Sequence, residues 1–152
     1  MNEIISVLTV SAIPVSEIRG GLPLAIYYGF DPMDAYFISL IGNIIPIPFL
    51  LLSLEYLVSF ATKIQFLDSI YGKILKRIES KREFVEKYGY IGLIMFVSIP
   101  LPITGAWTGT LIAFLLQMNK IKSLISIFTG VCIAGFIVLL TSLGVISVIF
   151  IK

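Results

Sequence analysis

A carboxylate and a guanidinium lie two positions apart inside a strongly apolar stretch near the N-terminus. Glu17 and Arg19 belong to PVSEIRGGLP, residues 14–23. Charged side chains are costly in an apolar environment, and inside membrane segments they mark substrate or proton pathways. Arg19 can bind an anion such as a phosphate or carboxylate. Glu17 can bind a cation or relay a proton.

The two side chains can also serve each other. If the segment is extended, a spacing of two places Glu17 and Arg19 on the same side, where they can form an ion pair. Such a pair would neutralise both charges and brace the segment without touching a substrate. The sequence leaves both interpretations open.

A second broken segment, PLPITGAWTG at residues 100–109, contains Pro, Gly and Thr but no charge. Its threonines can donate to a ligand or cap a helix, and Trp107 can cover a ligand or anchor the segment at an interface. We predict that substrate-binding residues are Glu17, Arg19, Gly20, Gly21, Asn43, Thr104, Gly105, Trp107 and Thr108. We predict structural roles in the two broken segments for Pro14, Pro23, Pro100, Pro102 and Gly109.

The composition is typical of an integral membrane protein. Of the 152 residues, 58% are hydrophobic and 13% are charged, and the mean hydropathy is +1.04, unlike an ordinary soluble domain. We expect one membrane domain, residues 1–152, in the plasma membrane of a prokaryotic cell. The formal net charge of +2 gives no support for nucleic-acid binding.

The residue types also limit the chemistry. The chain has one Cys and no His, so we expect no disulfide framework, no metal site and no cofactor. The sequence contains no recognisable nucleophile with a base and no carboxylate dyad, so we do not expect an enzyme.

Uncharged runs at residues 35–54, 88–119 and 123–151 are the clearest structural landmarks. Roughly 20 helical residues cross the hydrocarbon core, so the first and third runs predict spanning helices. Pro46 and Pro48 predict a bend in the first of these helices.

Two other apolar regions, residues 4–30 and 89–118, are each broken in the middle. Their halves are only long enough to reach about the bilayer midplane, which predicts two re-entrant helical hairpins. In the first hairpin, Gly20 and Gly21 would reverse the chain, and Pro23 would begin a short helix over residues 22–28. A helix over residues 110–116 would complete the second hairpin.

Residues 63–88 form a polar connector whose apolar positions recur at spacings of three, four and seven, which predicts a basic amphipathic helix. This helix would lie on an anionic membrane surface or pack on the protein itself. A broken hairpin followed by a spanning helix occurs twice, in residues 1–60 and 89–151. The positive-inside rule puts the connector in the cytoplasm and both termini outside, so the two halves would be an inverted-topology repeat. A layout in which the broken segments span fully is the alternative.

The segments SEIRGGLP and SIPLPITGAWTG resemble the small multidrug export protein family over nearly the whole chain. This resemblance implies a membrane protein and says little about its substrate. The facing hairpins also resemble the DedA or VTT-domain superfamily, whose members are linked to moving phospholipids or polyprenyl-phosphate carriers. Those relatives carry an acidic residue in the first hairpin, which Glu17 matches, and arginines in the second hairpin, which this chain lacks.

We predict a small transporter or lipid flippase that moves an anionic amphiphile of the lipid-phosphate type between the two broken segments, with protonation of Glu17 coupled to the step. Membrane lipids and a second copy of the chain, in a homodimer, are the expected partners. A proton-coupled exporter of cationic drugs would need Glu17 but not Arg19. A non-transporting scaffold would instead depend on the basic residues of the connector: Lys73, Lys76, Arg77, Lys81 and Arg82.

Overall fold

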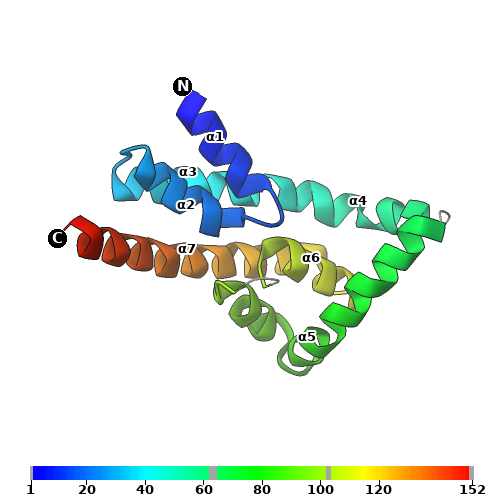
Figure 1. The fold of residues 1–152 in the computed structure, drawn as a ribbon. Coiled ribbons are helices and arrows are strands. Elements are labelled where there is room, and N and C mark those ends of the chain that lie inside the picture. The colour runs from blue at the N-terminus through cyan, green and yellow to red at the C-terminus, as the bar shows by residue number, and fades with distance from the viewer. Residues whose placement is uncertain (1, 62–64, 102–103, 151–152) are drawn as a thin grey trace.

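The computed structural model describes residues 2–61, 65–101 and 104–150, with side chains described outside residues 55–81 and 145–150. Within these residues every regular element is an α-helix, which confirms the predicted all-α class (Figure 1). The helices are α1 (Asn2–Ala12), α2 (Glu17–Tyr27), α3 (Pro32–Ile44), α4 (Pro46–Ala61), α5 (Gln65–Ser98), α6 (Ala106–Leu115) and α7 (Lys120–Phe150).

Within the part of the chain that the structure describes, two helical stretches are long and apolar enough to cross a membrane. They are Pro32–Leu54, which joins α3 to the start of α4, and Lys120–Gly144 in α7. The first stretch is interrupted between Ile44 and Pro46, because proline has no N–H to continue the helical hydrogen bonds. Pro46 therefore interrupts the helix, but the predicted bend is not marked, because α4 continues in roughly the direction of α3 (Figure 1).

Helix α5 changes direction at Gly89, whose φ of 58° and ψ of −135° are not helical. Glycine adopts a positive φ without the steric cost that a Cβ would bring. This break coincides with the boundary predicted between the connector and the second half of the chain. Residues 63 and 64 of the predicted connector lie outside the described residues. Among its predicted basic residues, Arg82 has a described side chain, and its Nε lies 3.8 Å from Glu86 Oε2.

The turns that follow α2 and α6 have the same backbone hydrogen bonds at positions 88 residues apart (28 to 116, 29 to 117, 30 to 118). In the first turn, N–H groups of residues 28, 29 and 30 donate to carbonyls of residues 24, 26 and 25; in the second, those of 116, 117 and 118 donate to 112, 114 and 113. The central residue has a positive φ in both turns, 86° at Gly29 and 52° at Gln117. The two halves therefore share a detailed local geometry.

Two glycines at close helix contacts are also 88 residues apart (42 to 130). A Cβ on Gly42 of α3 would lie 2.7 Å from Leu8 O and 2.8 Å from Ser11 Cβ of α1. A Cβ on Gly130 of α7 would lie 2.7 Å from Val97 Cβ of α5. Gly42 thus lets α3 approach α1, and Gly130 lets α7 approach α5, more closely than any other residue would allow.

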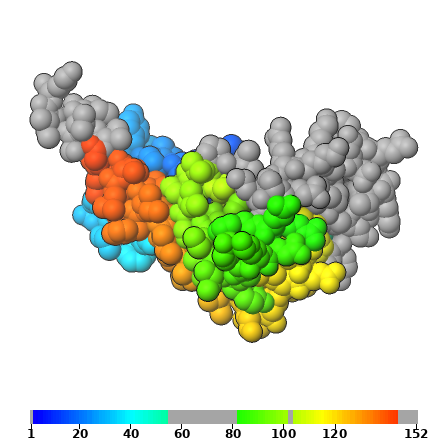
Figure 2. Space-filling view, turned by 90° about the horizontal axis from the view of Figure 1, so that it is seen from below, coloured from blue at the N-terminus to red at the C-terminus, as the bar shows by residue number. Residues whose placement is uncertain are grey.

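Helix α7 packs against α3 but runs in the opposite direction (Figure 1). The shared core includes Ile18, Leu22, Leu40, Leu93, Ile112 and Ile127. Figure 2 shows α7 beside the C-terminal part of α5 on one face of the molecule. The outer faces of the long helices expose large apolar side chains, as expected of surfaces that meet lipid; they include Phe37, Ile41, Phe49, Leu52, Ile125, Phe128, Phe136 and Leu140.

Candidate functional site

The turn between α1 and α2 covers residues 13–16, and α2 begins at Glu17. The predicted helix start at residue 22 is therefore wrong, because Gly20 and Gly21 are helical and Pro23 lies inside α2. The glycines serve helix packing: a Cβ on Gly21 would lie 1.7 Å from Ser11 Oγ of α1. Pro14 lies exposed in the turn, as predicted.

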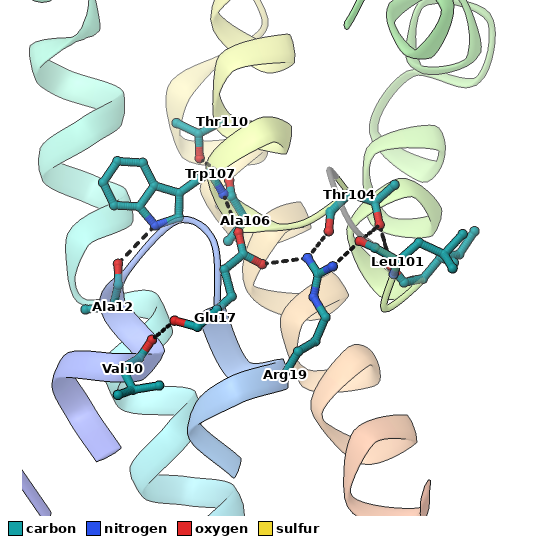
Figure 3. Close-up of polar contacts among 11 residues, drawn as sticks. Val10, Ala12, Glu17, Arg19, Leu101, Thr104, Ala106, Trp107 and Thr110 are labelled. Carbon is teal, nitrogen blue, oxygen red and sulfur yellow. Dashed lines mark hydrogen bonds and ion pairs between the residues drawn. The ribbon is translucent and has the colours of Figure 1, made fainter. Parts of the chain in front are cut away.

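Glu17 and Arg19 form the ion pair that their spacing allows. Arg19 Nη2 lies 3.1 Å from Glu17 Oε2, and the side chains of Arg19 and Glu17 are 21% and 4% exposed (Figure 3). The expected extended backbone is wrong, because Arg19 is helical and Glu17 has a φ of 49°. This unusual backbone conformation at Glu17 lets the pair form at the start of a helix.

Arg19 also binds the loop between α5 and α6. Its guanidinium donates from Nη1 to the carbonyl of Leu101 and from Nη2 to the carbonyl of Thr104 (Figure 3). The Thr104 hydroxyl bonds within its own loop, 2.6 Å from the Ile99 carbonyl oxygen and 2.8 Å from that of Leu101. Thr104 therefore orders the loop that accepts from Arg19.

Glu17 lies at the N-terminus of α6, where helical N–H groups have no partner within the helix. The Trp107 N–H donates to Glu17 Oε1 at 3.3 Å. Gly105 is the N-cap of α6, and a Cβ on it would lie 2.0 Å from Glu17 Oε2. The positive end of α6 thus holds a carboxylate of the protein itself.

Helix α6 begins at Ala106, four residues before the predicted start. Trp107, the half-buried Thr108 and Gly109 are therefore helical rather than part of an irregular segment. Gly109 allows close packing, because its Cβ would lie 2.6 Å from Val97 Cγ2. Pro100 lies in the loop after α5, as predicted, and Pro102 lies outside the described residues.

The two hairpins exchange side-chain donors. The Trp107 indole Nε1 donates to the carbonyl of Ala12 at the end of α1, at 3.2 Å, while Arg19 donates to the loop after α5. Arg19 and Trp107 are themselves 88 positions apart (19 to 107). Each hairpin therefore donates from a side chain at a corresponding position to a backbone carbonyl of the other hairpin, although one side chain is Arg and the other is Trp.

Asn43 is 1% exposed in α3, and neither of its side-chain polar atoms has a hydrogen-bond partner. Ser11 and Ser39 are also buried with unpartnered hydroxyls. Ser11 was not among the predicted site residues. The signal that could have found it is a small polar residue in an apolar helix, two residues before the turn.

A cavity of about 560 Å³ lies apart from these contacts. It is lined by Leu51 of α4, the end of α6 and the start of α7, where Gln117 and Lys120 provide its polar groups. None of the predicted substrate-binding residues is among the described residues that line it.

A family model described as "Putative small multi-drug export protein" matches residues 17–137, which include Glu17, Arg19 and the whole loop between α5 and α6. The chain belongs to this family. No curated protein and no solved structure matches it. The described residues include two helical stretches able to cross a bilayer. Together with the family match, they make the chain a small membrane protein of an export family.

Proposed function

We propose that this chain is a transporter that moves an anionic amphiphile, such as a lipid phosphate, past the contact between its two hairpins. The observation that carries the proposal is the position of Glu17, a carboxylate held between Arg19 and the N-terminus of α6. A phosphate or carboxylate head group has the same chemistry and can take the same place, because helix N-termini and guanidinium groups both bind anions.

Protonation of Glu17 would couple to this exchange. A neutral Glu17 no longer forms a charged pair with Arg19 and binds the positive end of α6 less strongly. A substrate anion would then replace the negative charge that Glu17 has lost. One proton and one anionic group would thus enter the site together, and the charge of the site would be restored.

The two halves would form an inverted-topology repeat with re-entrant hairpins. The matching turn hydrogen bonds, the matching glycine contacts and the opposite directions of α3 and α7 support this arrangement. Rocking of one half against the other would open the hairpin contact to each side of the plasma membrane in turn. We place the connector in the cytoplasm and both termini outside, and we propose a non-enzymatic homodimer of the DedA type.

Reconstitution in liposomes with a fluorescent lipid phosphate tests the proposal. Arg19→Ala should lower the transport rate at least about tenfold, the effect of losing about 1.4 kcal/mol in the rate-limiting step. Glu17→Gln should remove the dependence of transport on a pH gradient. The matched control is Arg82→Ala, because Arg82 pairs with Glu86 away from the hairpin contact. Wild-type transport by Arg19→Ala would reject the proposed anion site.

The family description favours a second candidate, export of cationic drugs. In that case Glu17 would bind either a proton or the cationic group, and Arg19 would only hold the hairpins together. Drug efflux from cells would then depend on Glu17 and survive Arg19→Gln, which removes the positive charge but keeps a hydrogen-bond donor to the loop. Competition between a cationic drug and the lipid phosphate would separate the two candidates.

A further inference from the structure

Among the described side chains of residues 2–54, four polar atoms are buried without a hydrogen-bond partner: Ser11 Oγ, Ser39 Oγ, Asn43 Oδ1 and Asn43 Nδ2. Buried polar groups in folded proteins nearly always have a hydrogen-bond partner, often an ordered water molecule. The side chains concerned come from α1 and α3, and all are at most 1% exposed. Such a group of unsatisfied atoms points to a ligand.

The second half has apolar side chains at the corresponding positions. Gly109 and Gly21 correspond in the register of 88 (21 to 109), and a Cβ on Gly109 would contact Val97 Cγ2 at 2.6 Å and Ile127 Cγ1 at 3.9 Å. In the first half Ser39 corresponds to Ile127 in this register (39 to 127). Ser11 corresponds to Val97 by its contacts, because Ser11 meets the Cβ positions of Gly21 and Gly42 as Val97 meets those of Gly109 and Gly130. Ser11 and Ser39 therefore lie at positions where the second half has the hydrocarbon side chains of Val97 and Ile127.

These polar residues follow one another toward Glu17. Ser11 contacts the positions of both Gly21 and Gly42, and Gly21 lies one helical turn after Glu17 on the same face of α2. Helices α2 and α3 pack together and run in opposite directions (Figure 1), so Asn43, one residue after Gly42 near the end of α3, lies closer to the level of the start of α2 than Ser39 does. Ser39 lies one turn away from Asn43.

The chemistry of the unpartnered atoms selects the ligand. A metal cation could satisfy the two hydroxyl oxygens and Asn43 Oδ1, but it cannot accept from Asn43 Nδ2. Water both donates and accepts, and a buried water molecule typically makes about three hydrogen bonds. We propose that Ser11, Ser39 and Asn43 bind ordered water molecules that conduct protons to Glu17.

This inference rests on the proposed protonation of Glu17. In the transfer, an O–H bond forms on the Glu17 carboxylate as an O–H bond breaks in a protonated water molecule. The neutral water that remains then receives a proton from the next water in the chain. Among the described charged groups, Arg19 is the one in contact with Glu17; α6 presents the Trp107 N–H. Tyr36 of α3 bonds the Cys132 carbonyl of α7 and lies beside Gly135, next to Ile18.

Proton flux into liposomes that contain a pH-sensitive dye tests the pathway. Asn43→Leu should lower the flux about tenfold. Ser39→Ala is a milder change that tests the pathway even if the Asn43→Leu variant does not fold, and it should lower the flux two- to threefold. The control is Ser123→Ala, which removes a buried, unpartnered hydroxyl outside this group and should leave the flux unchanged. Wild-type flux in both pathway variants would overturn the proposal, as would a wild-type flux no greater than that of empty liposomes.

The melting temperature gives a readout that does not depend on transport. A hydrated site makes Asn43→Leu less stable than the wild type, whereas a dry site makes it more stable because an unsatisfied group is removed. A wild-type melting temperature raised by Na⁺ but not by K⁺ would identify a cation site and overturn the assignment to water. If Glu17→Gln stops proton flux and Asn43→Leu does not, the water pathway fails and the proposed coupling stands. If Glu17→Gln conducts as the wild type does, the proposed coupling itself fails.

Discussion

The two hairpins contribute different groups to their contact. The first supplies charged side chains from the start of α2, Glu17 and Arg19. The second supplies mainly backbone groups, the carbonyls of Leu101 and Thr104 and the N–H of Trp107. Two segments with matching turn geometry can thus meet in one site although only one of them carries the charges. Side-chain changes should therefore matter most in the first hairpin, and changes that displace the backbone should matter most in the second.

The largest expected effect is that of Arg19→Ala, which leaves the Glu17 carboxylate buried without its cation. We expect it to lower the free energy of unfolding by about 3 kcal/mol, as when one partner of a buried ion pair is removed. Glu17→Gln should cost less, because Arg19 keeps its backbone acceptors. Denaturant unfolding in detergent measures both, and equal losses would show that burial of the carboxylate charge is not the cause.

The close contacts of Gly42 and Gly130 test whether the two halves share one frame. A Cβ would meet backbone or Cβ atoms within 3.0 Å at either position, so Gly42→Ala and Gly130→Ala should each cost about 2 to 3 kcal/mol through overpacking. Gly144→Ala is the matched control, since nothing lies within 4 Å of its Cβ position. Clearly unequal losses of stability for Gly42→Ala and Gly130→Ala, measured by thermal unfolding, would show that the two halves are not packed in the same way.

Gly105→Ala addresses the backbone contribution of the second hairpin. The φ of 167° at Gly105 is open to any residue, so the substitution acts through contact alone. The added methyl group would displace the Glu17 carboxylate and cost about 2 kcal/mol. In a chain that already carries Glu17→Gln, the overpacking caused by Gly105→Ala remains at least as large. The electrostatic cost of displacing a carboxylate is absent there, and a double-mutant cycle would measure this difference. A cycle with no coupling would contradict the contact.

Trp107→Phe has the smallest expected effect. It removes the indole N–H that donates to the Ala12 carbonyl, a loss of about 1 kcal/mol for one hydrogen bond. Thermal unfolding would measure it beside Trp107→Ala, which also removes the apolar contact. A loss as large as that of Arg19→Ala would show that the second hairpin contributes side chains as important as those of the first.

Proline and hydrophobic patterns predicted the order of the elements well. The interruption at Pro46, the boundary at residue 89 and the two broken segments follow from local rules about backbone hydrogen bonds and helix length. The start of α2 was not predictable in this way. Gly20 and Gly21 have the same poor helix propensity whether they form a turn or a packing surface, and only the approach of Ser11 decides between the two.

The opposite charges of Glu17 and Arg19 indicated an ion pair, but the backbone that forms it and the surroundings of the pair were not predictable. The carbonyl acceptors of Arg19 and the position of Glu17 at α6 depend on how two distant hairpins pack. Backbone acceptors leave no trace in residue type, so the sequence of the second hairpin indicates neither. Asn43 was expected to line a site, whereas its burial without a partner became visible only when α1 and α3 were packed together.

The distance along the chain between Arg19 and its acceptors has a consequence for biosynthesis. Leu101 and Thr104 follow Arg19 by 82 and 85 residues, and a ribosome adds that length in roughly 4 to 17 s at typical elongation rates. During this time the first hairpin has left the ribosome without its partner. Glu17 and Arg19, adjacent and of opposite charge, can neutralise each other while they wait. The spacing of two therefore lets the nascent chain neutralise both charges before the second hairpin exists.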